Sequence, residues 1–100
     1  MKICFLDNTD FEYSYLDKYD AKLRGAETIL INLSEHLKKM GHDVSVFNNC
    51  PNDIHIGNNN WFNLNHINKK EFHEFDVAIS NADINFFDKV NAKKKFVISY

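Results

Sequence analysis

Candidate chemistry in this chain centres on a glycine that stands directly before a periodic apolar segment. Gly25 precedes residues 26–40, where apolar side chains recur every three or four positions, a spacing typical of an amphipathic helix. The apolar positions are Ala26, Ile29, Leu30, Leu33, Leu37 and Met40. The unpaired N–H groups and positive dipole end of a helix start suit an anion, and glycine lets a phosphate approach the backbone closely. By itself Gly25 is more simply explained as a plain turn residue, and Arg24 either neutralises a phosphate or is simply exposed.

Other residues with chemical potential form no recognisable catalytic or metal-binding pattern. The five histidines lack the spacing of metal ligands, so we expect no metal site. Asp53 and His55 lie in a polar stretch and are better read as solvated. No Ser-His-Asp or Cys-His arrangement can be assigned from residue order. Asp83 follows an apolar run at a position suited to chemistry, although a helix cap explains it more simply. We therefore assign no catalytic residue.

Phosphate-binding loops of the common kinds are missing from the sequence. No Gly-x-Gly-x-x-Gly follows the first apolar run, and no Gly-Lys-Ser/Thr is present. A dinucleotide cofactor of the usual kind is therefore not expected.

Size and composition narrow the class of protein. One hundred residues with 44% hydrophobic content are enough for one core and one domain, spanning residues 1–100. The net charge of -2 gives no basis for a nucleic-acid partner. Two cysteines without a spacing pattern indicate a reducing compartment. Residues 1–6 are too short for a signal peptide, and no apolar run approaches the roughly 20 residues of a membrane span. We therefore expect a cytoplasmic location.

Apolar runs and helical periods alternate along the chain. Strands are expected at residues 2–7, 43–47, 61–64, 76–80 and 96–100, with the helix at 26–40 after the first. Residues 48–60 are expected to be a polar loop, 65–75 to hold a helical turn or two, and 83–90 a short helix. This order predicts an α/β fold, a Rossmann-like parallel sheet of about five strands with helices on both faces, as an incomplete domain. Ligands of such sheets bind beyond the carboxyl ends of the strands, which loops 8–25, 48–60 and 81–83 should border.

The segment before the helix is long for a strand-to-helix connection. Residues 8–23 contain several large apolar or aromatic side chains among acids, including Tyr13 and Tyr15. Connections of this length tend to be functional or disordered, and the aromatic content argues against disorder. The segment is either an insert that packs on the domain or a lid over the ligand.

Two short motifs carry a resemblance to a known family. Arg24-Gly25-Ala26-Glu27, a helix and then Gly41-His42-Asp43-Val44 resemble the N-terminal domain of GT-B-fold glycosyltransferases of the family-four type. That family shows Gly-Gly-Ala-Glu, a helix with a leucine-rich face, and Gly-His-x-Val leading into a strand. The strands beginning at Met1 and Asp76 fit the same pattern. In this chain Arg24 stands where the family has its first glycine.

The resemblance implies a nucleotide-sugar-dependent transferase built from two Rossmann-like domains. It places the donor diphosphate at the turn formed by Arg24, Gly25 and Ala26. It implies an acceptor, a sugar or a lipid, bound by the acceptor-side loops with Asn8, Tyr13, Tyr15, Asn81 and Asp83. The nucleotide-sugar is a substrate, and no cofactor or metal is implied. The donor-binding domain is missing from these 100 residues, so we expect the chain alone to be inactive. Nothing in the sequence supports contact with a membrane surface.

Two other functions remain open at this point. A non-catalytic α/β module would bind a nucleotide or a protein through the same crevice, and calorimetric titration with nucleotides would separate it from the acceptor half of a transferase. A receiver-like signalling domain is a weaker alternative, because Asp7 is a single acid followed by Asn8.

Overall fold

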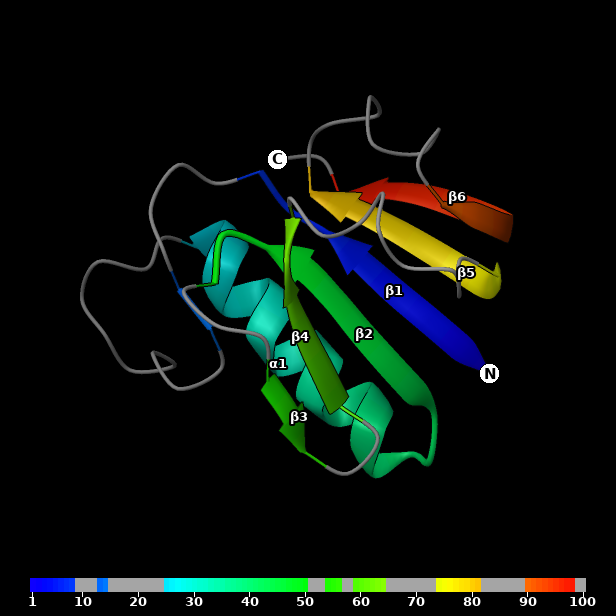
Figure 1. Ribbon diagram of the computed structural model, residues 1–100, viewed down its shortest axis with the longest axis horizontal. Coiled ribbons are helices and arrows are strands. Elements are labelled where there is room, and N and C mark those ends of the chain that lie inside the picture. The colour runs from blue at the N-terminus through cyan, green and yellow to red at the C-terminus, as the bar shows by residue number, and fades with distance from the viewer. Residues whose placement is uncertain are drawn as a thin grey trace.

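The computed structural model describes residues 1–8, 13–14, 25–50, 54–56, 59–64, 74–81 and 90–98. Within these residues the chain forms one helix and six strands (Figure 1). Their bounds are β1 Lys2–Leu6, α1 Gly25–Lys39, β2 Asp43–Asn48, β3 Ile54–Ile56, β4 Asn59–Asn63, β5 Glu74–Asn81 and β6 Asn91–Ile98. In this part of the chain no helix is both long and apolar enough to cross a membrane.

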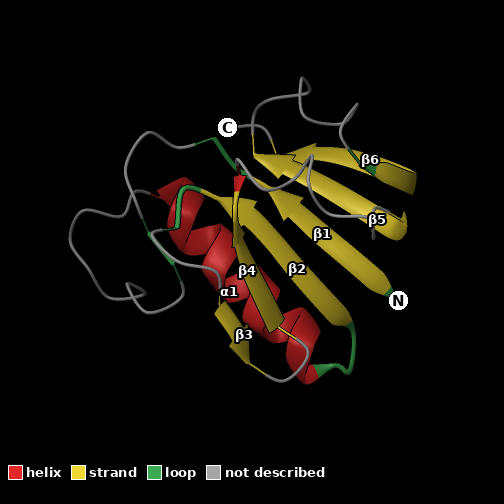
Figure 2. Ribbon diagram, viewed as in Figure 1, coloured by secondary structure: helices red, strands yellow, loops and turns green. Residues whose placement is uncertain are grey.

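The strands form one sheet in the order β3-β4-β2-β1-β5-β6 (Figure 2). β1 pairs in parallel with β2 on one side and with β5 on the other, and β4 and β6 extend the parallel sheet outward. The short β3 pairs antiparallel with β4. The expected α/β, Rossmann-like parallel sheet is therefore confirmed, with five parallel strands among the described residues and one antiparallel strand at the edge.

One face of the sheet is covered by α1, which lies behind it in Figure 1. Leu30 and Ile31 of the helix are fully buried against a cluster made by β1, β2 and β4. Its sheet members are Ile3, Phe5, Val44, Val46 and Trp61. Helices were expected on both faces of the sheet. Within the described residues, a helix covers only the face that carries α1.

The opposite face of the sheet holds a second buried cluster, rich in phenylalanine. Phe47 stacks on Phe62 with ring centroids 5.4 Å apart and meets Phe75 edge-on at 6.3 Å. Cys4, Leu6 and other apolar side chains complete it. Strand β1 thus contributes to both clusters through alternate residues, as a central parallel strand buried on both faces must.

The buried stripe of α1 is rotated from the predicted one. Leu30 was correctly expected to be inside, but Ile29 is 46% and Met40 61% exposed, so both predictions were wrong. The buried positions are Glu27, Leu30, Ile31 and Ser34, which follow the i, i+3, i+4, i+7 spacing of one helical face. The rotation follows from the position of the helix over β2 and β4. Two polar residues face inward there, and the Ser34 hydroxyl donates to the Ile31 carbonyl at 2.9 Å.

Strand boundaries also differ from the expected ones, chiefly at β3 and β4 and at the start of β6. Residues 48–60, expected to be a polar loop, contain β3 and the first residues of β4. β6 begins at Asn91 instead of Phe96, so the Lys93–Lys95 run lies within a strand. Lysines are tolerated there because β6 is an edge strand with exposed side chains, and edge lysines discourage unwanted pairing. Of the residues 65–75, expected to hold helical turns, Glu74 and Phe75 belong to β5, so the prediction was wrong there, and the rest lie outside the described residues. The helix expected at 83–90 also lies outside them, apart from the buried Val90.

Candidate functional site

Three neighbouring strands each end in a buried polar residue. Asp7 directly follows β1, Asn48 is the last residue of β2, and Asn81 is the last residue of β5. Because these strands are parallel, their carboxyl ends meet at one edge of the sheet. At this edge the buried side chains are therefore a carboxylate and two amides, whereas those in the interior of the sheet are mostly apolar.

This edge contains the point where the strand order reverses. From β1 the chain adds β2 and β4 on one side, then returns to add β5 and β6 on the other. Asp7 and Asn81 flank the reversal, and Asn81 Nδ2 donates to Asp7 Oδ1 at 3.2 Å. In open parallel sheets ligands bind in the crevice at this switch point, so topology and polar side chains indicate the same site.

Tyr13 borders the polar edge, which is the row formed by Asp7, Asn48 and Asn81 at the carboxyl ends of the strands. Its hydroxyl donates a hydrogen bond to Asp7 Oδ2, and its carbonyl accepts one from Asn48 Nδ2 at 2.8 Å. The ring is fully buried and meets Trp61 edge-on, with centroids 6.1 Å apart. Tyr13 is therefore an anchor that fastens the chain after β1 to the ends of β1 and β2.

The environment of Tyr13 keeps its hydroxyl protonated. Burial raises the pKa of Tyr13 most, followed by the negative charge of Asp7 and the hydrogen bond to it, and the charge of Glu27 adds to the rise. A phenol that holds its proton remains a donor to the Asp7 carboxylate. The influence of Glu27 also shows that the first turn of α1 lies near this edge, since Glu27 is fully buried in that turn.

Asn48 retains an acceptor without a partner. Its Oδ1 is buried and accepts no hydrogen bond within the described residues, while its Nδ2 is used by Tyr13. Buried polar atoms are normally satisfied, and an unsatisfied one costs about 1–3 kcal/mol. A polar group that reached this edge would relieve that cost.

The helix start has the openness expected of a ligand-facing turn. Gly25 is the first residue of α1 and is exposed, and a Cβ added there would meet no atom of the described residues within 4 Å. Its φ is not positive, so its backbone conformation does not require glycine. The absence of a side chain at Gly25 leaves open space next to the first N–H groups of the helix.

The other predicted site residues have varied positions. Asn8 is exposed directly after Asp7, and Asn81 and Tyr13 are buried in the polar edge. Ala26 lies in the first turn of α1. Arg24, Tyr15 and Asp83 lie outside the described residues.

Sequence reasoning missed two of the three strand-end residues as site members, Asp7 and Asn48. Each directly follows or ends a predicted apolar run. Because parallel strands align their carboxyl ends, reading the polar residue after every run would have identified the set.

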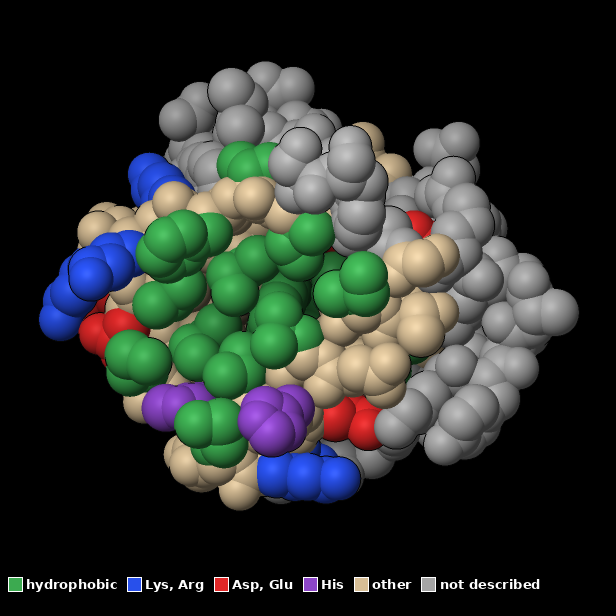
Figure 3. Space-filling view, turned by 180° about the vertical axis from the view of Figure 1, so that it is seen from behind, with side chains coloured by type: hydrophobic (Ala, Val, Ile, Leu, Met, Phe, Trp, Pro, Cys, Tyr) green, Lys and Arg blue, Asp and Glu red, His purple; other side chains and the backbone are tan. Residues whose placement is uncertain are grey.

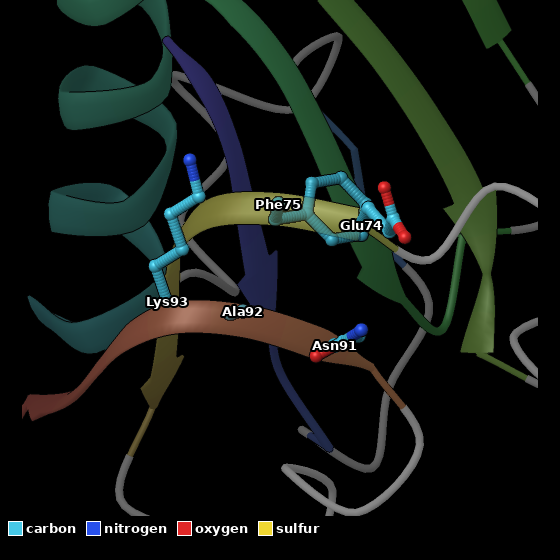
Figure 4. Close-up of a pocket in the computed structure, with 5 residues that line it drawn as sticks. All are labelled: Glu74, Phe75, Asn91, Ala92 and Lys93. Carbon is cyan, nitrogen blue, oxygen red and sulfur yellow. The ribbon is translucent and has the colours of Figure 1, made fainter.

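A hollow of about 250 Å³ lies at the other end of the sheet, near the amino ends of β5 and β6 (Figure 4). It is lined by Glu74, Phe75, Asn91, Ala92 and Lys93. Next to it, Asp76 accepts the Lys2 backbone N–H at 2.8 Å and pairs with Lys93 at 3.3 Å. The Lys2 hydrogen bond and then Lys93 lower the pKa of Asp76. Asp76 thus ties the starts of three strands together, which is a structural role.

The other side chains of chemical interest among the described residues are potential metal ligands and two cysteines. No group of three His, Cys, Asp or Glu side chains is placed there to hold a metal ion. Cys4 and Cys50 are both buried and form no disulfide.

Comparison of the chain with known protein families, curated proteins and solved structures found no match.

Proposed function

We propose that this chain is the acceptor-binding half of a glycosyltransferase that moves a sugar from a nucleotide-sugar to a sugar or lipid acceptor. The observation that carries the proposal is the row of Asp7, Asn48 and Asn81 at the switch-point edge. Amide groups both donate and accept hydrogen bonds and a carboxylate accepts them. This combination suits the hydroxyl groups of a sugar.

The charge of the edge favours a neutral ligand. Asp7 and Glu27 are both buried acidic residues near the start of α1, so a phosphate entering between them would be repelled. A neutral sugar carries no charge and would not be repelled by these carboxylates. The buried edge is therefore assigned to the acceptor.

The donor diphosphate is assigned to the outer side of the helix start. Gly25 is exposed with open space beside its Cα, and helix N-termini bind phosphate through unpaired N–H groups and the dipole. The family pattern assigns Arg24, Gly25 and Ala26 to the same turn. Arg24 would add a positive charge there.

Catalysis would require a second domain. A leaving diphosphate must be neutralised in a closed, water-poor cleft, and one sheet edge provides only one wall. We therefore propose that a donor-binding domain supplies the other wall, and that the 100-residue chain alone transfers no sugar.

Amide chemical-shift mapping of the chain tests the assignment. Titration with a panel of free monosaccharides should shift the amides of Asn8 and Asn81, and titration with UDP-glucose should shift Gly25. Asn8→Ala should weaken the monosaccharide response and leave the UDP-glucose response unchanged, because Asn8 is exposed at the acceptor edge. Gly25→Val should do the reverse.

Shifts confined to the hollow at Glu74 and Lys93, or no response to any sugar, would refute the proposal. Tight binding of the free nucleotide by this chain alone would instead favour a nucleotide-binding module.

A further inference from the structure

The face of the sheet that carries α1 is only partly covered. The helix packs over β2 and β4, so β5 and β6 extend beyond it. Figure 3 views the molecule from that side and shows hydrophobic side chains as a continuous area, with lysine, histidine and acidic side chains at its border. This surface lies on the opposite side of the sheet from the Phe47 cluster and is separate from the polar edge.

We define the α1–β6 patch by six apolar residues, Ile29, Leu33, Leu37, Val77, Ile79 and Phe96. Ile29 and Phe96 are 46% and 54% exposed, and the other four are half-buried. Phe96 belongs to this face because it registers with Ile79 across the β5–β6 pair, and paired residues of parallel strands share a face. The patch thus joins one side of a helix to an edge strand.

The shape of the patch suits a helix. Helices pack about 8–10 Å apart, axis to axis, and bury an apolar stripe against a sheet. α1 occupies one such position over β2 and β4, and the patch is the next position along the same face. Contiguous exposed apolar areas of this kind mark interaction sites.

The charge near the patch indicates which flanking residues a bound helix should have. Lys94 registers with Val77, a patch residue, and has no ion-pair partner within the described residues. The neighbouring Lys93 is 83% exposed and pairs with Asp76 at 3.3 Å. A helix with acidic residues on one flank would complement Lys94. A two-fold pairing of this patch with a second copy would place two Lys94 side chains in one interface and would supply neither with an acidic partner from the patch itself.

We propose that the α1–β6 patch is a docking surface for an amphipathic helix of another protein, with a leucine-rich stripe and acidic residues along the flank that meets Lys94. This inference does not depend on the proposed sugar chemistry, which concerns a different edge of the sheet.

Two synthetic helical peptides test it by fluorescence anisotropy against the full 100-residue chain. They share a leucine stripe and differ only in flanking residues, glutamate in one and lysine in the other. The glutamate peptide should bind about fivefold more tightly, the order expected from one exposed charge pair, and the preference should shrink as salt is added. Lys94→Glu should reverse the preference.

Variants of the apolar residues locate the binding surface. Phe96→Gln and Ile29→Gln should each weaken binding of the glutamate peptide severalfold, and both sites are exposed enough for the fold to tolerate the change. Val97→Gln is the matched control, because Val97 is 41% exposed but registers with Ser80 on the opposite face. It should bind as the unaltered chain does.

Three outcomes would overturn the proposal. One is no binding of either peptide. Another is equal loss of binding in Val97→Gln and Phe96→Gln. The third is a dimer in analytical ultracentrifugation that Phe96→Gln dissociates, which would make a second copy the occupant.

Discussion

Asn81 Nδ2 donates a hydrogen bond to Asp7 Oδ1 at 3.2 Å, and this contact joins the carboxyl ends of the two strands that flank the reversal of strand order. The two residues are 74 positions apart in sequence. Asp7 also accepts from Tyr13, so one buried carboxylate organises the strand ends and the chain that follows β1.

Removing the amide at residue 81 should destabilise the fold. Asn81→Ala takes a donor from a buried carboxylate, which should lower the free energy of unfolding by about 1–3 kcal/mol. Urea denaturation followed by circular dichroism measures it. Asn8→Ala is the matched control, because Asn8 is an exposed asparagine at the same edge, and it should change stability by less than about 0.5 kcal/mol. Equal effects of the two variants would show that the Asn81–Asp7 bond contributes nothing.

The hydroxyl of Tyr13 should matter separately from its ring. Tyr13→Phe keeps the edge-on contact with Trp61 but removes the donor to Asp7, and should cost about 2 kcal/mol. Tyr13→Ala also leaves a cavity and should cost about 3–5 kcal/mol, as large-to-small core changes do. The near-ultraviolet signal of Trp61 should persist in the first variant and change in the second. A loss of that signal in Tyr13→Phe would contradict this division.

The sequence predicted the fold better than the site. Apolar runs such as Lys2–Leu6 and Asp43–Phe47 mark buried parallel strands directly, and Gly41 marks the end of α1. The rotation of the helix was not predictable, because the burial of Glu27 and the exposure of Ile29 depend on which strands lie beneath the helix. Helical period alone cannot decide that.

The start of β6 was missed for a related reason. A run of three lysines reads as a loop when the strand is assumed to be buried, yet an edge strand tolerates it. Likewise, Asp7, Asn48 and Asn81 share an edge only because of strand order. Residues 7, 48 and 81 carry no common motif, and the one sequence signal they share is a place at the end of an apolar run.

Alkaline pH should weaken the fold through Cys4. Burial raises the pKa of the Cys4 thiol from 9.0 to about 12. Above pH 9 the unfolded chain therefore loses this proton while the folded chain keeps it, and stability falls as the pH rises from 9 towards 12. The raised pKa of Tyr13 acts in the same direction above pH 10, where a tyrosine of the unfolded chain loses its proton.

Cys4→Ala isolates the thiol contribution. The unfolding free energy of this variant should fall less steeply with rising pH than that of the unaltered chain, by at most about 1.4 kcal/mol per pH unit. Urea denaturation at pH 8, 9, 10 and 11 measures both slopes. The slope is compared instead of the absolute stability, because alanine also leaves a small cavity. Identical slopes in the two proteins would mean that the Cys4 thiol ionises equally well in the folded state.

The two glycines that bound α1 should respond oppositely to alanine. Gly41 has φ of 91°, its N–H donates to the Lys38 carbonyl at 2.9 Å, and the His42 N–H donates to Leu37 at 3.2 Å. This pattern is the helix-ending motif that needs a left-handed residue. Gly41→Ala should therefore cost about 1 kcal/mol. Gly25→Ala meets open space without a positive φ, so it should leave stability unchanged or slightly raised. Thermal and urea unfolding of both variants measure the difference in stability. A larger loss of stability in Gly25→Ala than in Gly41→Ala would contradict this prediction, because it would show that the helix start is constrained in spite of its open surroundings.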